Sequence, residues 1–204
     1  KWLGKAREAI GLEKAGIFRS NQPAVMVDRK PPQSVSARAD GLGVALYVLG
    51  RDFEVSSSSA DWCWRGPARE LSDLPRPSLQ GDFQLDNAAG AIMALELLGQ
   101  DFQPKASSVS HGLTNPGLHG RFEQIHSSPD VWVDVGHNAH ATVGLADNLA
   151  RTRRAGRTIA VAAMLVEKDI ERALSPLIDH FDEWHVAGLS GPRGDDGSAI
   201  AQTL

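Results

Sequence analysis

The stretch VWVDVGHNAHATVGLADNLARTRRAGRTIAVAAML, Val131–Leu165, decides the fold class. It begins with an apolar run at Val131–Val135, turns at Gly136 and continues as an expected helix over 139–153. It ends in a second, nearly continuous apolar run over 157–165. Strands that are apolar along their length and alternate with helices indicate parallel βαβ units with both sheet faces covered. We therefore predict an α/β fold.

The alternation of helix and strand patterns extends on both sides of this stretch. Because the texture changes after Pro116-Gly117, we draw a boundary there, with one domain over 1–118 and another over 119–204. In the first domain the expected elements are helices over 3–17, 31–39, 87–98 and 105–111, strands over 23–28 and 44–49, and hairpins over 52–74. In the second domain, strands over 121–126 and 183–189 and helices over 169–179 and from Gly197 are also expected.

Composition and charge exclude several classes of function. The 204 residues hold 21 Lys and Arg against 25 Asp and Glu, and the net charge of −4 gives no basic field for a nucleic-acid partner. A single cysteine, Cys63, excludes an internal disulfide and is typical of a reducing cytoplasm. No apolar run approaches the ~20 residues of a membrane span. We expect a cytoplasmic protein with no membrane or nucleic-acid partner.

Asp134, His137 and Asn138 follow the strand at Val131–Val135, at the place where α/β folds bind ligands. The N–H groups at the start of the next helix attract anions such as phosphate. Asp134 can bond a ribose hydroxyl or a water, and His137 and Asn138 can donate to phosphate oxygens. In the alternative interpretation, Asn138 only caps the helix and His140 is a surface residue. A metal site needs more ligands than this stretch offers.

Three further residues stand out in the sequence. Lys14 falls on the helix face of Ile10 and Ile17, which should be buried, so it is paired, snorkels or is a neutral amine able to form a carbamate. Arg121 lies just after the domain boundary, where it either clamps a phosphate or is solvated. Asn87 would ordinarily be a helix N-cap.

Two glycine- or charge-rich stretches carry weaker signals, and one expected motif is missing. MLVEKD (164–169) is interpreted as a loop after a strand and GPRGDD (191–196) as a turn. The sequence contains no G-x-x-x-x-G-K-[ST] phosphate loop and no G-x-G-x-x-G after a strand. The chain alone therefore has no P-loop for a triphosphate.

Taken in order, these stretches resemble one family. WLGKAREAIGLEKAGIFRSNQPAVMVD, NAAGAIMALELL, GRFEQI, VDVGHNAHA, MLVEKDI and GPRG look like successive motifs of bacterial dihydrofolate synthase/folylpolyglutamate synthases, members of the Mur ligase superfamily. The resemblance runs from Trp2 to about Gly194. It implies the last part of a Mur-type ATPase domain over 1–118, then the first part of a Rossmann-like C-terminal domain over 119–204.

The resemblance implies an ATP-dependent carboxylate–amine ligase of folate biosynthesis. ATP would phosphorylate the carboxylate of dihydropteroate or a folate, and L-glutamate would attack the acyl phosphate, with Mg²⁺ as cofactor and with a monomeric enzyme acting on small molecules. Lys14 would be carbamylated and help hold Mg²⁺. Asn87, Arg121 and Asp134 match nucleotide-contacting positions, and His137 matches a histidine beside the phosphates. Catalytic roles are thus expected for Lys14 and His137.

The chain departs from the family pattern in a few places. Gly136 and Ala139 stand where the family usually has Ala and Pro, and His119 stands where it commonly has Pro. The family's P-loop and a metal-binding histidine would precede Lys1, and the end of its C-terminal domain would follow Leu204. The chain is therefore expected to be a piece of such a ligase, inactive in isolation.

Two other classes of protein are weighed against this ligase. One is a non-catalytic nucleotide- or glutamate-binding remnant that lacks the P-loop. The other is a different Mur-type amide ligase, for example one acting on cell-wall precursors. EKAGIF (13–18) and DVGHNAHA (134–141) together favour the folate branch.

Overall fold

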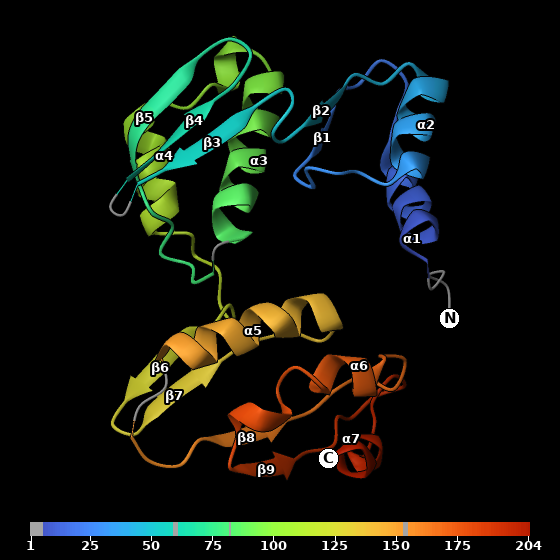
Figure 1. Ribbon diagram of the computed structural model, residues 1–204, viewed down its shortest axis with the longest axis vertical. Coiled ribbons are helices and arrows are strands. Elements are labelled where there is room, and N and C mark those ends of the chain that lie inside the picture. The colour runs from blue at the N-terminus through green and yellow to red at the C-terminus, as the bar shows by residue number, and fades with distance from the viewer. Residues whose placement is uncertain (1–5, 59–60, 82, 153–154) are drawn as a thin grey trace. The chain divides into compact units, whose positions relative to one another are not determined.

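The computed structural model describes residues 6–58, 61–81, 83–152 and 155–204. The chain divides into two compact units, Lys1–Gly117 and Leu118–Leu204, which are described separately below. Both units combine helices and strands (Figure 1), so the predicted α/β class is confirmed. No helix among the described residues is long and apolar enough to cross a membrane.

The first unit begins with a βαβ unit. It contains α1 (Arg7–Lys14), a 3-10 turn at Ala15–Ile17, β1 (Ala24–Met26), α2 (Gln33–Leu42) and β2 (Leu46–Val48). β1 and β2 pair in parallel, Ala24 opposite Leu46, with α2 as the crossover between them. The helix α1 packs along α2 (Figure 1). Leu3, expected to begin the first helix, lies outside the described residues.

The expected buried face of α1 is wrong. Ile17 is 76% exposed, Ile10 and Lys14 are exposed as well, and the buried positions are Gly11 and Ala15. A Cβ added at Gly11 would lie 2.8 Å from a Pro32 side-chain carbon, so the two helices approach closely through small residues. Contact through small residues turns the apolar stripe that carries Lys14 away from α2.

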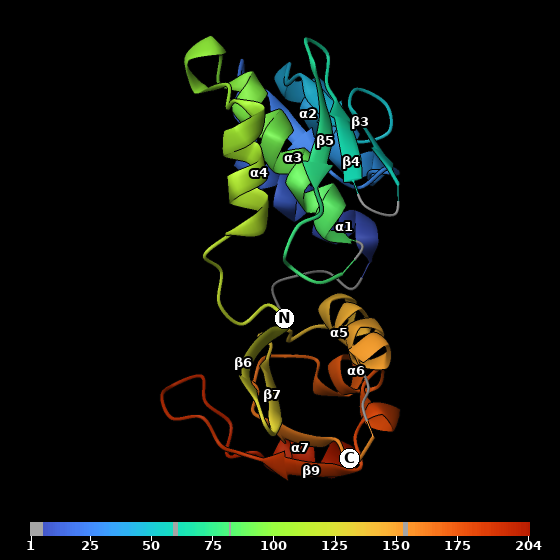
Figure 2. The same ribbon diagram turned by 90° about the vertical axis from the view of Figure 1, so that its left-hand side faces the viewer.

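The rest of the first unit is an antiparallel sheet with helices beside it. The strands β3 (Glu54–Ser57), β4 (Asp61–Arg65) and β5 (Glu70–Pro75) pair in that order, and α3 (Phe83–Leu97), a 3-10 turn at Gln100–Phe102 and α4 (Ala106–Thr114) follow. The two helices lie beside the sheet in both views (Figures 1 and 2).

Alternation along β4 places two tryptophans in the core of this sheet and its helices. Trp62 and Trp64 are buried, with Cys63 less buried between them. Trp64 Nε1 donates to Ala89 O on α3 at 3.2 Å, and Trp62 Nε1 donates to Pro75 O at 2.9 Å. Each buried aromatic side chain of this size contributes about 4–6 kcal/mol as an upper bound. Trp64 therefore bonds the sheet to α3, whereas Trp62 bonds β4 to the end of β5.

The second unit contains two strand pairs. β6 (Glu123–Ser127) and β7 (Asp130–Val133) are followed by α5 (Ala139–Thr152), β8 (Ile159–Ala162), α6 (Ile170–Leu174), a 3-10 turn at Ile178–His180, β9 (Glu183–Val186) and α7 (Ser198–Thr203). β8 and β9 pair in parallel, Ile159 opposite Glu183. Their core comprises Met164, Ile170, Ala173, Leu174 and Ile200, with Trp184 and Val186 packed against it.

Two expectations for the second unit are wrong. β6 and β7 form an antiparallel hairpin rather than part of a parallel sheet, because only Ser128 and Pro129 connect them. One face of β8 is uncovered by the described residues, and Val161 is 78% exposed. Residues on a strand alternate between faces, and α6 and α7 gather on the side of Trp184 and Val186.

Candidate functional site

Asp134 holds two loops together at the end of β7. Its Oδ2 accepts the N–H of Phe122 at 2.8 Å and its Oδ1 accepts the N–H of Gly136 at 2.6 Å. Val135 N donates to Gly120 O at 3.0 Å in the same place. The turn before β6 and the loop before α5 are thus bonded into one structure, which we call the corner and define as residues 119–138. The carboxylate of Asp134 is therefore occupied by backbone, although it is exposed.

The turn that enters β6 has an unusual backbone. Gly120 has φ 68° and Phe122 has φ 48°, the left-handed region that costs a non-glycine residue about 1–2 kcal/mol. The Phe122 ring is 4% exposed and stacks on Trp132 of β7 with the ring centroids 4.5 Å apart. Burying a Phe side chain contributes about 1.5–3 kcal/mol, and the bond to Asp134 adds to this. These contacts are enough to offset the backbone cost.

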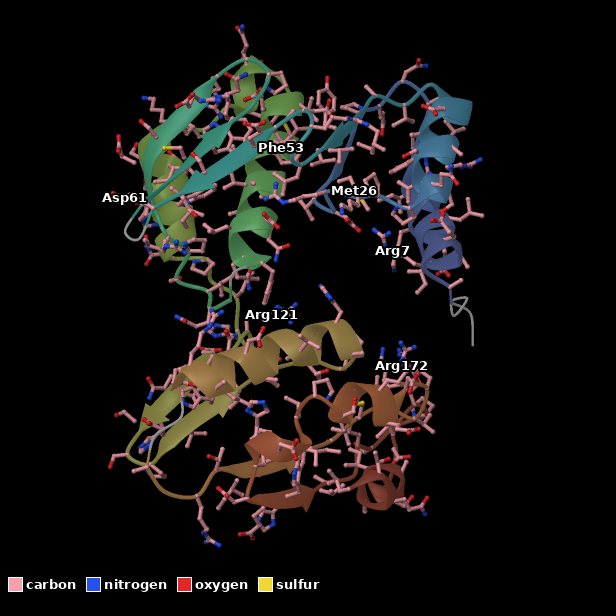
Figure 3. All side chains as sticks on the ribbon, viewed as in Figure 1. Arg7, Met26, Phe53, Asp61, Arg121 and Arg172 are labelled. Carbon is pink, nitrogen blue, oxygen red and sulfur yellow. The ribbon has the colours of Figure 1, made fainter. Side chains whose placement is uncertain are left out.

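Arg121 lies between these two left-handed residues and is labelled in Figure 3. Its side chain is exposed, and its guanidinium makes no hydrogen bond or ion pair with the part of the chain that the structure describes. A planar guanidinium held on a rigid turn is suited to bind two oxygens of a phosphate or carboxylate at once. The corner therefore presents a cation that has no internal partner.

His137 presents one ring nitrogen outward from the same corner. Its Nδ1 lies 2.9 Å from Val135 O, and because a carbonyl only accepts, Nδ1 carries the proton. This bond fixes the ring and leaves Nε2 to accept when the ring is neutral or to donate when it is protonated. His137 is exposed, so Nε2 is open to an incoming ligand.

Asn138 caps α5, as the alternative interpretation held. Its Oδ1 accepts the N–H of Ala141 at 3.0 Å, and its carbonyl accepts the N–H of Thr142 at 3.0 Å. His140 lies exposed in the first turn of α5. The structure therefore joins three of the predicted site residues, Arg121, Asp134 and His137, and gives Asn138 a structural role.

Lys14 and Asn87 lie on separate helices of the first unit. Lys14 ends α1, where a cation is favoured by the helix dipole, and its amine makes no bond to the described residues. Asn87 is not an N-cap, because α3 begins four residues earlier at Phe83; Gln84 N bonds Gly81 O there. Asn87 Nδ2 instead donates to Gln84 Oε1 at 3.0 Å. No bond between Lys14 and Asn87 occurs among the described residues.

The two weaker stretches of the sequence lie side by side in the second unit. Val166 N donates to Arg193 O at 3.2 Å, and the Arg193 guanidinium pairs with the Glu167 carboxylate. Arg193 lowers the pKa of Glu167, and Glu167 raises the pKa of Arg193. The sequence could have predicted this contact. MLVEKD follows β8 and GPRGDD follows β9, and the carboxyl ends of two paired parallel strands lie at the same edge of a sheet.

A metal ion finds few ligands near these residues. The described residues contain no group of three or more His, Cys, Asp or Glu side chains placed to hold one. Lys14, even as a carbamate, would supply a single residue's oxygens, whereas Mg²⁺ takes six ligands, several of them waters and substrate phosphates.

The comparisons with known proteins include the corner in the regions that they match. Residues 120–204 match the model of the Mur ligase, glutamate ligase domain, from the turn at Gly120 through the corner and β8–β9. This part of the chain is therefore similar to that domain of the Mur ligases. The matched region begins within the corner.

The similarity to known proteins extends over the whole chain. Dihydrofolate synthase/folylpolyglutamate synthase of Escherichia coli (strain K12) is 36% identical over 203 residues, which is 100% of this chain and 47% of that protein. The structure of E. coli FolC in complex with DHPP and ADP has a TM-score of 0.88 at 35% identity, covering 100% of this chain and 48% of that one.

A second solved structure is a bifunctional folylpolyglutamate synthase/dihydrofolate synthase with Mn, AMPPNP and L-glutamate bound. It has a TM-score of 0.85 at 35% identity, with the same coverage of 100% and 48%. The chain is homologous over its whole length to bacterial dihydrofolate synthase/folylpolyglutamate synthases, and it spans about half the length of these relatives.

Proposed function

We propose that the full-length protein containing this chain is an ATP-dependent ligase of folate biosynthesis. It joins L-glutamate to dihydropteroate, to (poly)glutamylated tetrahydrofolate, or to both, with ATP as phosphoryl donor and Mg²⁺ as cofactor. The observation that carries this proposal is the match over the whole chain to an enzyme with Mn, AMPPNP and L-glutamate bound. We also propose that it is a monomeric cytoplasmic enzyme whose partners are small molecules, with no nucleic acid or membrane.

The proposed reaction forms one amide through an acyl phosphate. The substrate carboxylate attacks the γ-phosphorus of ATP, the bond to the bridging oxygen breaks, and ADP leaves. The amine of L-glutamate then attacks the acyl carbon, loses a proton and expels phosphate. The protein must bind two anions and stabilise the charge that develops on the transferring group. Mg²⁺, when bound, neutralises part of the phosphate charge.

In this proposal the corner supplies the protein's groups for the phosphates. Arg121 binds phosphate oxygens through its unpaired guanidinium, and His137 donates from Nε2 when protonated, as a catalytic residue beside the phosphates. Asp134 contributes by fixing the backbone on both sides of these residues. Its two oxygens have further lone pairs, so contact with a ribose hydroxyl is compatible with its backbone bonds.

The roles proposed for the first unit rest on the family match. We propose that Lys14, as a carbamate, is a catalytic residue and a metal ligand, and that Asn87 contacts the nucleotide. Lys14 is exposed, which leaves its amine accessible to carbon dioxide. We further propose that residues 1–118 end an ATPase domain of the Mur ligase type and that 119–204 begin the C-terminal domain; the match to the Mur ligase, glutamate ligase domain over 120–204 supports this.

The test is glutamate-dependent ADP release by the full-length protein. The assay contains Mg-ATP with dihydropteroate in one arm and tetrahydrofolate in the other, and each arm is repeated without L-glutamate. Release that requires both the pteroate or folate and L-glutamate is expected. The 204-residue chain alone serves as the control and is expected to give no release, because its sequence holds no P-loop motif. ADP binding without turnover would instead favour the non-catalytic alternative.

A further inference from the structure

Glu123 is a second carboxylate that braces the turn carrying Arg121. Its Oε2 accepts the N–H of Gly120 at 2.8 Å, and its Oε1 lies 2.9 Å from Nδ1 of His119. The Glu123 side chain is 32% exposed, whereas that of His119 is 89% exposed. Glu123 begins β6, so its backbone is held by the strand while its side chain reaches back over the turn.

The carboxylates of Glu123 and Asp134 bond the backbone on either side of Arg121. Glu123 bonds the N–H before it, that of Gly120, and Asp134 bonds the N–H after it, that of Phe122. Both of these residues have positive φ, a conformation that a chain without such bonds rarely keeps. The direction in which Arg121 leaves the turn therefore depends on both carboxylates.

We propose that Glu123 is a positioning residue for Arg121 in nucleotide binding, and that His119 makes this brace dependent on pH. This inference rests on the proposed function, because it assigns Arg121 to a phosphate. When His119 is protonated, its pair with Glu123 holds Oε1, which keeps Oε2 directed at Gly120 N. When His119 loses its proton, the charge attraction is lost and the carboxylate turns more freely.

The direction of the pH effect follows from the charges around the turn. Glu123 raises the pKa of His119 above its ordinary value of 6.5, through the hydrogen bond first and through charge second. His119 lowers the pKa of Glu123, again chiefly through their hydrogen bond. The pair is therefore charged on both sides from below pH 4.5 to above pH 6.5. The turn itself carries Arg121, and the carboxylate of Asp134 bonds its Phe122 N–H. His137 lies in the adjoining loop, where its ring bonds Val135 O.

A second His–Glu pair in the same unit supplies a matched control. Glu183 Oε1 lies 2.9 Å from His185 Nε2, and Glu183 Oε2 accepts from Arg157 at 3.1 Å rather than from the backbone of a turn. Glu183→Ala therefore removes an exposed His–Glu pair of the same kind without touching the corner. A larger effect of Glu123→Ala than of Glu183→Ala therefore points to the bond to Gly120, which only Glu123 makes.

The first experiment measures the ADP dissociation constant and amide exchange in the full-length protein. Glu123→Ala is expected to weaken ADP binding about tenfold, the size of losing a hydrogen bond to a charged group, and Glu183→Ala to change it less than about twofold. Without nucleotide, the amides of Gly120 and Phe122 are expected to exchange faster in Glu123→Ala only. Equal ADP affinity and equal exchange in the two variants would overturn the proposal.

The second experiment measures how ADP affinity depends on pH, a property that a purely structural role of Glu123 would not change. The ADP affinities of the wild-type protein and of His119→Gln are compared between pH 6 and 9, and both proteins keep His137. The wild type is expected to lose about two- to fivefold more affinity across this range than His119→Gln, the size expected for an exposed ion pair. Identical pH profiles would overturn the role of His119.

If Glu123→Ala does not fold, the conservative variant Glu123→Gln tests the same proposal. The amide oxygen of Gln can still accept the N–H of Gly120, so ADP affinity at pH 8 is expected to stay within about threefold of wild type. Its pH profile should match that of His119→Gln; a profile identical to wild type would count against the proposal. Amide exchange is measured without nucleotide, so it tests the bond from Glu123 independently of catalysis. If exchange is unchanged in Glu123→Ala while glutamate-dependent ADP release persists, the positioning role fails and the proposed function stands. If ADP release is absent while exchange changes as expected, the proposed function fails instead.

Discussion

Two carboxylates in this chain perform the same bonding with different consequences. Asp134 accepts the backbone N–H groups of Phe122 and Gly136 in the second unit. Glu8 on α1 accepts those of Gln33 and Ser34, at 3.1 and 2.8 Å, at the start of α2 in the first unit. Pro32, the N-cap residue of α2, offers no side-chain cap, so Glu8 caps that helix from a neighbouring one. A carboxylate on two N–H groups is thus a general joint between elements.

The difference lies in what each joint leaves free. Around Glu8, the other polar groups are used internally: Ser34 Oγ donates to Glu8 O at 2.7 Å, and Arg7 pairs with Asp28 at 2.6 Å. Around Asp134, the guanidinium of Arg121 has no partner among the described residues and His137 keeps one ring nitrogen open. Near Asp134, donor groups without an internal partner remain to bind a ligand, so this region is a candidate site. Near Glu8, the neighbouring donors are bonded within the chain, so the contact there is structural.

Replacing the two carboxylates in turn should separate these roles most strongly. Asp134→Ala is expected to weaken ADP binding by the full-length protein about 10- to 100-fold, because two N–H groups lose a charged acceptor and the turn carrying Arg121 relaxes. Glu8→Ala is expected to lower the melting temperature but to leave ADP affinity within about twofold. Isothermal titration and thermal melts measure both; equal losses of affinity would abolish the distinction.

The α1–α2 contact can be broken without touching either carboxylate. Gly11→Ala places a Cβ 2.8 Å from Pro32 Cγ and should lower the free energy of unfolding by about 1–3 kcal/mol through overpacking. Gly16→Ala is the matched control, since a Cβ there meets no atom within 4 Å. Urea unfolding of both variants checks this. Similar values for the two glycines would show that the close approach of the helices is wrong.

The Lys14→Met variant tests whether the first unit contributes a residue to the proposed ligase reaction. Lys14 makes no bond to the described residues, so the melting temperature should fall only slightly, through loss of the favourable interaction of its charge with the α1 dipole. If it holds metal as a carbamate, glutamate-dependent ADP release should fall about tenfold or more. Lys30→Met, on the loop between β1 and α2, serves as the control. Full activity in Lys14→Met would remove Lys14 from the proposed site.

The smallest expected effect is the pH dependence of the Glu8 joint. The bond from the backbone of Ser34, first among the causes, lowers the pKa of Glu8 below its ordinary value of 4.5. A carboxyl with a depressed folded pKa stabilises above its unfolded pKa and loses that contribution as pH falls through the folded pKa. The melting temperature of wild type should therefore fall more than that of Glu8→Gln between pH 5 and pH 3. Glu13→Gln, on the same helix, is expected to follow wild type.

The order of helices and strands was predictable because each depends on local signals. The apolar runs at β7 and β8 and the start of α5 were found from residue type and spacing, as were the hairpins of β3–β5. Periodicity failed on α1, because small residues at Gly11 and Ala15 form the contact that apolar residues were expected to form. The apolar run over β8 predicted that both faces of the strand are covered, but Val161 is exposed, because an apolar run does not show which face of a strand is covered.

The corner was predictable only in part. The position of Asp134 at the end of a strand marked it as a candidate, as did Arg121 at the domain boundary. Glu123 was missed, because its role depends on the positive φ of Gly120 and Phe122, and a phenylalanine gives no sequence signal for that conformation. Hydrogen bonds that join residues 12 or more positions apart, such as Phe122 N to Asp134, depend on the folded backbone.

The most direct test of the corner is a structure of the full-length protein with ADP or AMPPNP and Mg²⁺. We predict phosphate oxygens within hydrogen-bond distance of the Arg121 guanidinium and of His137 Nε2, with Asp134 still bonded to the N–H groups of Phe122 and Gly136. Nucleotide phosphates bound elsewhere, with Arg121 and His137 in solvent, would contradict the assignment of the corner.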